Sequence, residues 1–270
     1  MFNRNLTFVK KAAFSLAVAA LGAMLSAAAC EPKRSPTFNV GFNFHLVSQG
    51  EDSQEFRLRV DRMLEIMKRI FKNAKFEIDS VEYFVHTGPD AERLTHVDIY
   101  LDEDGTGWPD QMEELLTWSS RAPNKNIDIF LVRSVGNDFL ILGAAGDIPG
   151  PAQKGTPRSG ILLNTFGDFF AMTNSELALQ ASTLVHEAGH YLGLWHTTER
   201  NGLEFDLLRD TPECPSWTYD FDHDGVVSPI ECYNLDGQFL MFWAAGTYAQ
   251  EDLSGDQIAV MKNHPWVREK

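Results

Sequence analysis

HEAGHYLGLWH, at residues 186–196, is the stretch of the chain that carries most information about its fold. Residues four apart lie on one face of an α-helix, so His186 and His190 can point their imidazole nitrogens at one metal ion, with Glu187 beside them. Gly193 can adopt a positive φ and end the helix, which lets the chain turn and bring His196 to the same ion. Three protein ligands with a fourth position left open are typical of catalytic zinc. We therefore expect these three histidines to hold zinc.

The chemistry expected of such a site is hydrolysis of a peptide bond. Zinc lowers the pKa of a bound water and polarises a carbonyl group. Glu187 is placed to take the proton of that water and to pass it to the leaving amine, so it is the candidate general base. Histidines at helical spacing also occur by chance. Gly193 and His196 at the further positions make a chance match rare, about one in 450 for this composition.

The other elements indicate a mixture of strands and helices. Apolar residues recur at helical spacing from Phe56 to Phe71, and Thr173 with Glu176 forms a capping-box pattern at the start of the helix that leads into the histidines. Ser254 with Gln257 likewise predicts a last helix over residues 256–262. Apolar runs predict strands at 40–46, 76–85, 97–101, 127–132, 139–144 and 161–164. The expected fold class is α/β, or α+β.

Residues 186–196 resemble the signature of the metzincin zinc peptidases. The pappalysin branch in particular is suggested by the residues among and after the histidines, Gly189, Leu192, Gly193, Leu194 and Thr197. Two later segments agree. DLLRDTP at 206–212 is similar to an acidic segment that follows the third histidine in pappalysins, and FLMF at 239–242 is similar to the loop whose methionine, here Met241, lies beneath the metal. Residues 253–261 look like the C-terminal helix of that branch.

The resemblance implies a metzincin-like catalytic domain over residues 38–270. In it, a mixed sheet with backing and active-site helices (38–194) lies above a smaller irregular lower subdomain (195–270), and the substrates are proteins or peptides. One position departs from the family. A tyrosine that helps to stabilise the oxyanion usually stands two residues after the methionine, where this chain has Trp243. Either Tyr248 takes that role or zinc alone polarises the carbonyl.

Residues 1–29 have the pattern of an export signal, in which Arg4, Lys10 and Lys11 precede an uncharged run rich in alanine and leucine that ends in small residues. A membrane-spanning anchor is the alternative, although the run is short for one. Cys30 follows directly, as in bacterial lipoprotein signals whose cysteine is acylated. We expect an exported protein, with residues 30–37 as a tether. It is held at an outer surface or in the periplasm if Cys30 is lipidated, and secreted if it is not.

Two acidic segments are candidate calcium loops. DFDHDGVVSPIE at 220–231 places ligands at the spacing of an EF-hand loop, namely Asp220, Asp222, Asp224, Val226, Ser228 and Glu231. Residues 102–113 have poorer spacing, with candidate ligands Asp102, Asp104, Thr106, Asp110 and Glu113. A solvated acidic turn before a helix is the alternative there. Cys214 and Cys232 bracket the first loop, and we expect them to form a disulfide, which persists outside the cytoplasm.

The charge of the chain bears on its partners. With 38 acidic and 23 basic residues, and a net charge of −15, nucleic acid and anionic membrane surfaces are poor partners. Two other functions stay open. The acidic loops suit a calcium-dependent binding module, which leaves Glu187 unexplained, and Trp243 suits a pseudoenzyme that holds zinc without turnover. Hydrolysis of casein by the pure protein, abolished by a zinc chelator, separates an endopeptidase from both.

Overall fold

The computed structural model describes residues 37–98, 102, 105–136, 141–246 and 249–270, and those from Thr37 to Lys270 belong to one compact unit. The predicted signal at 1–29, Cys30 and nearly all of the tether lie outside the described residues, as do Asp104 and Tyr248. In the described part of the chain, every helix is too short or too polar to cross a membrane. The division into subdomains at residue 194 stays a prediction.

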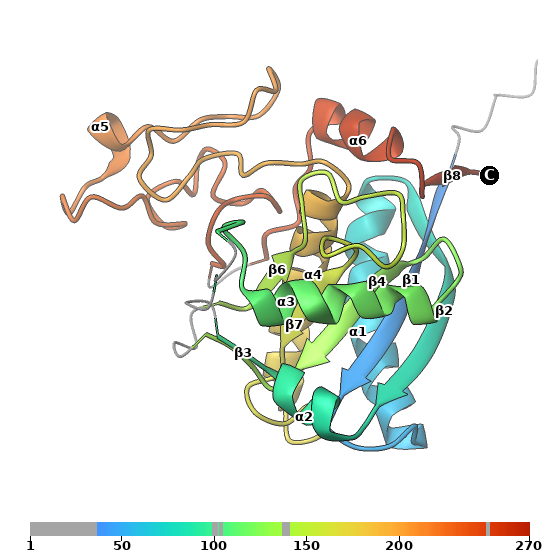
Figure 1. The fold of residues 1–270 in the computed structure, drawn as a ribbon. Coiled ribbons are helices and arrows are strands. Elements are labelled where there is room, and N and C mark those ends of the chain that lie inside the picture. Colours follow the sequence, from blue (N-terminus) through green and yellow to red (C-terminus); the bar gives the residue numbers. More distant parts are fainter. Residues whose placement is uncertain (1–36, 99–101, 103–104, 137–140, 247–248) are drawn as a thin grey trace, which may run out of the picture. The chain divides into compact units, whose positions relative to one another are not determined.

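A mixed sheet forms the centre of the fold, with its strands in the order β2-β1-β4-β7-β6 (Figure 1). Their bounds are β1 Phe38–Val47, β2 Phe76–His86, β4 Ile127–Val132, β6 Gly143–Ala145 and β7 Ile161–Asn164. The first four strands in this order run parallel, whereas β6 pairs antiparallel with β7 and forms one edge. β8 (Arg268–Glu269) pairs with the start of β1, and β3 (His96–Val97) pairs with β5 (Ser134–Val135).

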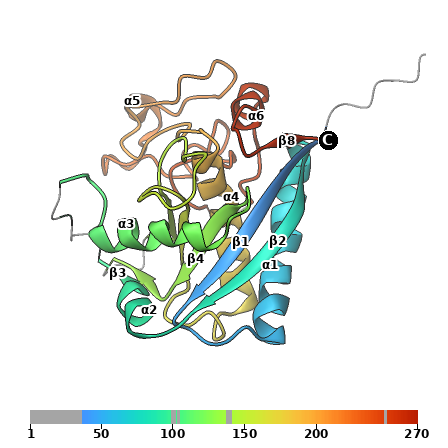
Figure 2. The same ribbon diagram turned by 45° about the vertical axis from the view of Figure 1, so that its right-hand side comes forward.

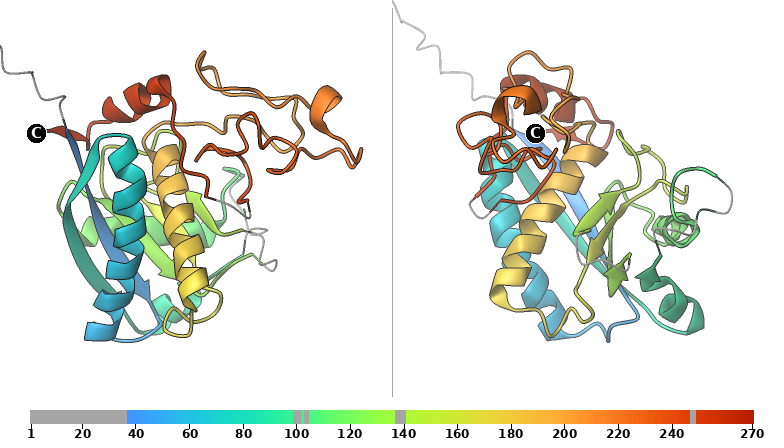
Figure 3. Two further views of the ribbon diagram at one scale, coloured as in Figure 1. Left: turned by 180° about the vertical axis from the view of Figure 1, so that it is seen from behind. Right: turned by 90° about the vertical axis from the view of Figure 1, so that its left-hand side faces the viewer.

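Helices cover both faces of this sheet. The long helices α1 (Gln54–Asn73) and α4 (Asn174–Tyr191) pack side by side on one face (Figure 3, left). The other face carries α2 (Pro89–Leu94), α3 (Asp110–Leu116) and the 3₁₀ helix η1 (Thr117–Arg121), as Figure 2 shows for α2 and α3. The predicted class, a mixed α/β fold, is confirmed.

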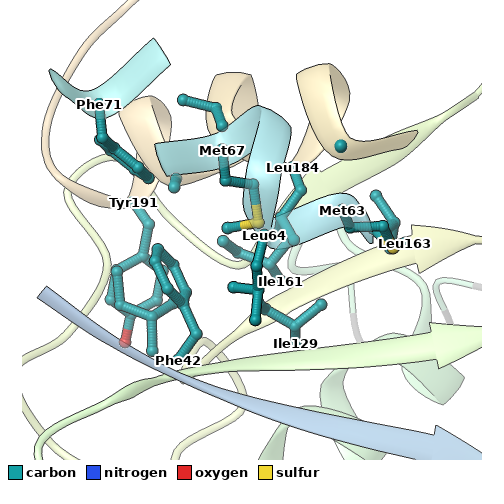
Figure 4. Packing of buried hydrophobic residues seen from close by; sticks show 14 of the residues in the cluster. Phe42, Met63, Leu64, Met67, Phe71, Ile129, Ile161, Leu163, Leu184 and Tyr191 are labelled. Atoms are coloured by element: carbon teal, nitrogen blue, oxygen red, sulfur yellow. The ribbon is translucent and has the colours of Figure 1, made fainter. Parts of the chain in front are cut away.

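The hydrophobic core lies between the sheet and the two long helices. Side chains alternate across a strand, so Phe42 of β1 and Ile129 of β4 point toward α1 and α4, and their neighbours point to the opposite face. On α1, Met63 and Met67 belong to the apolar stripe that its helical periodicity predicts (Figure 4). Because the sheet and α1 hold α4 along its length, the residues on the exposed side of α4 have a fixed position.

The chain is mostly irregular after α4 and lies beyond the C-terminal end of that helix (Figure 1). It contains the short helix α5 (Ser216–Tyr219) and the capped helix α6 (Gly255–Lys262), whose capping box is the predicted pair Ser254 and Gln257. Two predicted strands differ. Of the run at 97–101, Val97 lies in β3 and Asp98 does not lie in a strand, whereas 99–101 lie outside the described residues. Of the run at 139–144, residues 139–140 lie outside the described residues, 141–142 are not in a strand, and pairing with β7 starts at Gly143. Apolar pattern alone does not show where a partner strand begins.

Candidate metal centre

Three imidazoles converge at the end of α4. His186 and His190 project from the same face of the helix, and the Nε2 atom of His196 lies 3.3 Å from that of His186 and 3.1 Å from that of His190. Among the described residues, these histidines form one of the groups whose ligand atoms all lie within 4.8 Å of one another. The spacing of the three histidines in the sequence therefore brings their Nε2 atoms together at one point in the fold.

The Nδ1 atoms of the triad show which nitrogens are free to bind a metal. His186 Nδ1 lies 2.6 Å from the carbonyl oxygen of Leu240, and His190 Nδ1 lies 2.7 Å from that of Leu194. A carbonyl oxygen can only accept, so each Nδ1 carries the proton and each Nε2 offers a lone pair. His196 Nδ1 lies 3.0 Å from both carboxylate oxygens of Glu199, which imposes the same tautomer. This arrangement fits zinc, which takes neutral imidazole ligands whose second nitrogen is held.

The turn after α4 explains how His196 returns to the helix. α4 ends at Tyr191, and Gly193 has the positive φ of 108° that its residue type predicted. The amide of Leu194 then donates to the carbonyl of Gly189 at 2.9 Å, and this turn directs the carbonyl of Leu194 at His190. Helix termination thus supplies both the third histidine and one of the groups that orient the triad.

Met241 packs directly against α4 below the histidines. It is fully buried, and a Cβ atom added at Gly189 would come within 2.5 Å of its Sδ atom. Its carbonyl oxygen accepts from the amide of Thr197 at 2.9 Å, and the preceding carbonyl, that of Leu240, accepts from His186. The segment around Met241 therefore positions two of the three histidines.

Burial sets the protonation states in the centre. It lowers the pKa of His186 to about 4, with His196 as a further cause, and it lowers the pKa of His190 well below the ordinary value. Both rings are therefore neutral near pH 7. The hydrogen bond from His196 lowers the pKa of Glu199, whose carboxyl stays ionised.

Glu187 lies beside the histidines without belonging to their cluster. Its side chain is buried, and its Oε2 atom accepts from the amide of Ala145, in the edge strand β6, at 2.8 Å. Burial raises the pKa of this carboxyl to about 8. Gly143 allows the close approach, since a Cβ atom there would lie 2.9 Å from Glu187 Cγ. A carboxyl group with a raised pKa next to a metal site is the arrangement expected of a general base.

The histidines and Glu187 open into a cleft of about 860 Å³. Its walls come from β6 and the residues before it, from α4, and from the segment after Met241. Trp195 lines the cleft and is 59% exposed, so a large apolar surface lies next to the triad. Glu187 and the triad therefore line one cleft that opens to solvent beside Trp195.

Trp243 cannot replace the tyrosine as an oxyanion donor. Its indole Nε1 donates to the carbonyl oxygen of Val227 at 2.7 Å, which engages the one donor of this side chain. Arg200 lies over the indole ring, 5.7 Å from its centroid, and the carbonyl of Arg200 accepts from the amide of Val227. Trp243 is therefore a wall residue that connects the cleft to the acidic loop at 220–231.

The acidic loop at 220–231 partly matches the predicted calcium ligands. Carboxylate oxygens of Asp220, Asp222 and Asp224 gather within 4.8 Å of one another. Glu231 does not join them, and its carboxylate instead accepts from the amides of Phe221 and Ser228, both at 2.8 Å. The remaining predicted ligands, Val226 and Ser228, lie within the same loop. A disulfide joins Cys214 to Cys232, as predicted, and closes the segment that carries the loop.

The second acidic segment is arranged differently. Glu113 accepts from Thr106 Oγ1 at 2.9 Å and pairs with Arg158 at 3.0 Å. Asp102 accepts from the amides of Thr106 and Gly107. In the described part of this segment, Asp102, Asp110 and Glu113 do not form a cluster of ligand atoms. The carboxylates of Asp102 and Glu113 are thus bonded to neighbouring amides, a hydroxyl group and Arg158, and no described side chain caps the start of α3.

Sequence reasoning missed the groups that orient the triad. Leu240 and Leu194 act through backbone carbonyls, which carry no signal in the sequence. Glu199 stands three residues after His196, in a region with no helical periodicity to relate the two. A search for acids within a few residues of each histidine would have found it, without saying which atom it contacts.

A comparison with protein families agrees with this site. The model of peptidase family M43, described as pregnancy-associated plasma protein-A, matches residues 119–264, more than half of the 270-residue chain. No curated protein gives a significant match. Metalloproteinase-II from Bacteroides fragilis is similar over 83% of this chain and 52% of its own, with 13% identity and a TM-score of 0.41. Archaemetzincin from Methanopyrus kandleri is similar over 63% of this chain and 82% of its own, with 15% identity and a TM-score of 0.35. This chain thus spans about half the length of the Bacteroides structure.

Proposed function

Because the chain belongs to peptidase family M43, that of pregnancy-associated plasma protein-A, we propose that it is an exported zinc endopeptidase with Glu187 as its general base. The observation that carries the proposal is the convergence of the Nε2 atoms of three imidazoles beside a buried carboxyl group at the floor of an open cleft. His186, His190 and His196 hold the metal, which when bound supplies a Lewis acid and an activated water.

The environment of Glu187 suits transfer of a proton in both directions. Burial alone holds its pKa near 8, which favours the protonated carboxyl. A metal cation bound by the adjacent histidines would favour the carboxylate, so the group could accept a proton at neutral pH. The amide of Ala145 fixes Oε2. Glu187 can then take a proton from the attacking water and deliver it to the leaving amine.

The edge of the sheet suits an extended peptide substrate. β6 pairs with β7 on one side and lines the cleft with the other. A peptide laid along β6 would pass beside Glu187, because Ala145 of that strand touches the Oε2 atom of Glu187. Addition of a strand to an exposed sheet edge is a common mode of peptide recognition.

Export and calcium binding are further parts of the proposal. The basic, apolar and small-residue pattern of residues 1–29 supports export, with Cys30 as the acylation site of a lipoprotein. The gathered carboxylates of Asp220, Asp222 and Asp224 support one calcium ion at 220–231, where it would order a segment with little regular structure. That ion would have a structural role, because the loop reaches the wall of the cleft through Val227, whose carbonyl accepts from Trp243.

The deciding experiment is turnover of casein by the purified zinc-loaded protein, with and without chelator. Glu187→Gln keeps an acceptor for Ala145 and all three histidines, so it should retain zinc and lose about 10²- to 10⁴-fold in rate. Glu204→Gln, an exposed acid elsewhere, is the control and should keep full activity. Stoichiometric zinc without any turnover would identify a pseudoenzyme, and calcium binding without zinc would identify a binding module.

A further inference from the structure

The three histidines of the metal centre are not held in the same way. His186 and His190 lie on α4, and backbone carbonyls accept from their Nδ1 atoms. His196 lies outside the helix, its side chain is 23% exposed, and a side-chain carboxylate holds its Nδ1 atom. Side chains vary from protein to protein, whereas every residue offers a carbonyl. The contact between His196 and Glu199 therefore depends on the residue type at position 199.

A tight hairpin holds Glu199 in place. Thr198 forms a β-bridge with Phe205, the amide of Glu199 donates to the carbonyl of Glu204 at 2.9 Å, and the amide of Gly202 donates to the carbonyl of Glu199 at 2.8 Å. The chain thus reverses direction between Glu199 and Glu204, and the two arms of the hairpin lie side by side. The backbone of Glu199 is thus bonded on both sides, and its carboxylate meets His196 with both oxygens at 3.0 Å.

We propose that Glu199 is a positioning residue that fixes the tautomer and orientation of His196 and thereby raises the affinity of the centre for zinc. This inference rests on the proposed function, since it assigns the metal to the same three histidines. A carboxylate on the far nitrogen makes an imidazole a more basic ligand and prevents the proton from moving to the metal-binding nitrogen. The Glu199 carboxylate also places a negative charge next to the triad, which favours a bound cation.

The position of Glu199 also allows a competing role, because the residue lines the cleft and could bind a basic substrate side chain directly. The two roles differ in what they change. A positioning residue changes zinc affinity in the absence of substrate. A substrate contact changes KM at saturating zinc and leaves zinc affinity alone.

The test measures the zinc dissociation constant of the intact chain by competition with a chromophoric chelator at pH 7, without substrate. Glu199→Ala should weaken zinc binding by about 10- to 100-fold, the usual cost of removing such a partner. Glu199→Gln keeps an oxygen that can accept from Nδ1, so its loss should be smaller. Glu204→Gln makes the same change of charge in the same hairpin at an exposed side chain, and should match the parent.

The outcomes separate this inference from the proposed function. If the parent protein binds no zinc, the proposed function is wrong, whatever the Glu199 variants do. If the parent binds zinc and both Glu199 variants bind it within twofold of the parent, the positioning role is wrong. A raised KM with unchanged zinc affinity would assign Glu199 to the substrate instead. If the melting temperature of the metal-free protein shows that Glu199→Ala does not fold, the zinc dissociation constant of Glu199→Gln is used instead. A value within twofold of the parent would then refute the positioning role, and weaker binding would support it.

Discussion

Lowering the pH should destabilise this protein through two buried histidines remote from the metal centre. Arg121 donates to His86 Nδ1 at 2.9 Å, His86 Nε2 lies 2.8 Å from His45 Nδ1, and His45 Nε2 lies 2.9 Å from Asp128 Oδ1. Arginine can only donate, so each ring donates onward from Nε2 and both rings are neutral. Lys154 pairs with the other oxygen of Asp128. A proton added to either ring would remove an acceptor that the chain of bonds uses.

The size of the effect follows from the pKa of His86. Burial, followed by the charges of its neighbours, lowers it from 6.5 to about 3, and burial also lowers the pKa of His45. Below pH 6.5, His86 binds a proton in the unfolded chain but not in the folded chain. Stability therefore falls as pH drops from about 6.5 toward 3. At pH 5 the His86 contribution alone amounts to about 2 kcal/mol.

The assay is urea unfolding of the metal-free protein at pH 7 and pH 5, with chelator present so that zinc binding does not contribute. His86→Gln cannot titrate and keeps a donor and an acceptor in the side chain. The parent should lose about 2 kcal/mol more than His86→Gln between the two pH values. His96→Gln removes an exposed histidine and should lose as much as the parent.

Equal losses for the parent and His86→Gln would refute the reasoning. That result would mean that His86 takes up a proton in the folded protein at nearly its ordinary pKa, and that the bond from Arg121 does not hold it neutral. The lower stability of the variant at pH 7 does not affect the comparison, because only the change with pH is used.

Three further outcomes are expected. Gly189→Ala should lower the free energy of unfolding by about 1–3 kcal/mol, since its Cβ atom would press on the Met241 sulfur at 2.5 Å, and urea unfolding measures this. Asp222→Ala combined with Asp224→Ala should lower both calcium content and melting temperature in calcium buffer, and unchanged values would remove calcium from the loop. Cys30→Ser should release the protein from the membrane fraction or block its processing, whereas a parent that is fully soluble with an unmodified Cys30 contradicts lipidation.

Local geometry made much of this molecule predictable from its sequence. Helical periodicity places residues four apart on one face, so the spacing of His186 and His190 is enough to pair them. The positive φ of Gly193 and both capping boxes also follow from residue type over a few positions. Such features depend on neighbours in the chain, which sequence displays directly.

The partners of the site residues were decided by tertiary packing. Leu240, which holds His186, is 54 positions away, and Ala145, which holds Glu187, is 42 positions away. Both contacts use backbone atoms, which every residue possesses, so no residue type marks them. The family resemblance put Trp243 at the position of the oxyanion tyrosine, two residues after Met241, yet only the fold showed that the carbonyl of Val227 accepts from its indole nitrogen. The direction of a side chain after an irregular loop depends on how that loop packs, and no short-range periodicity encodes it.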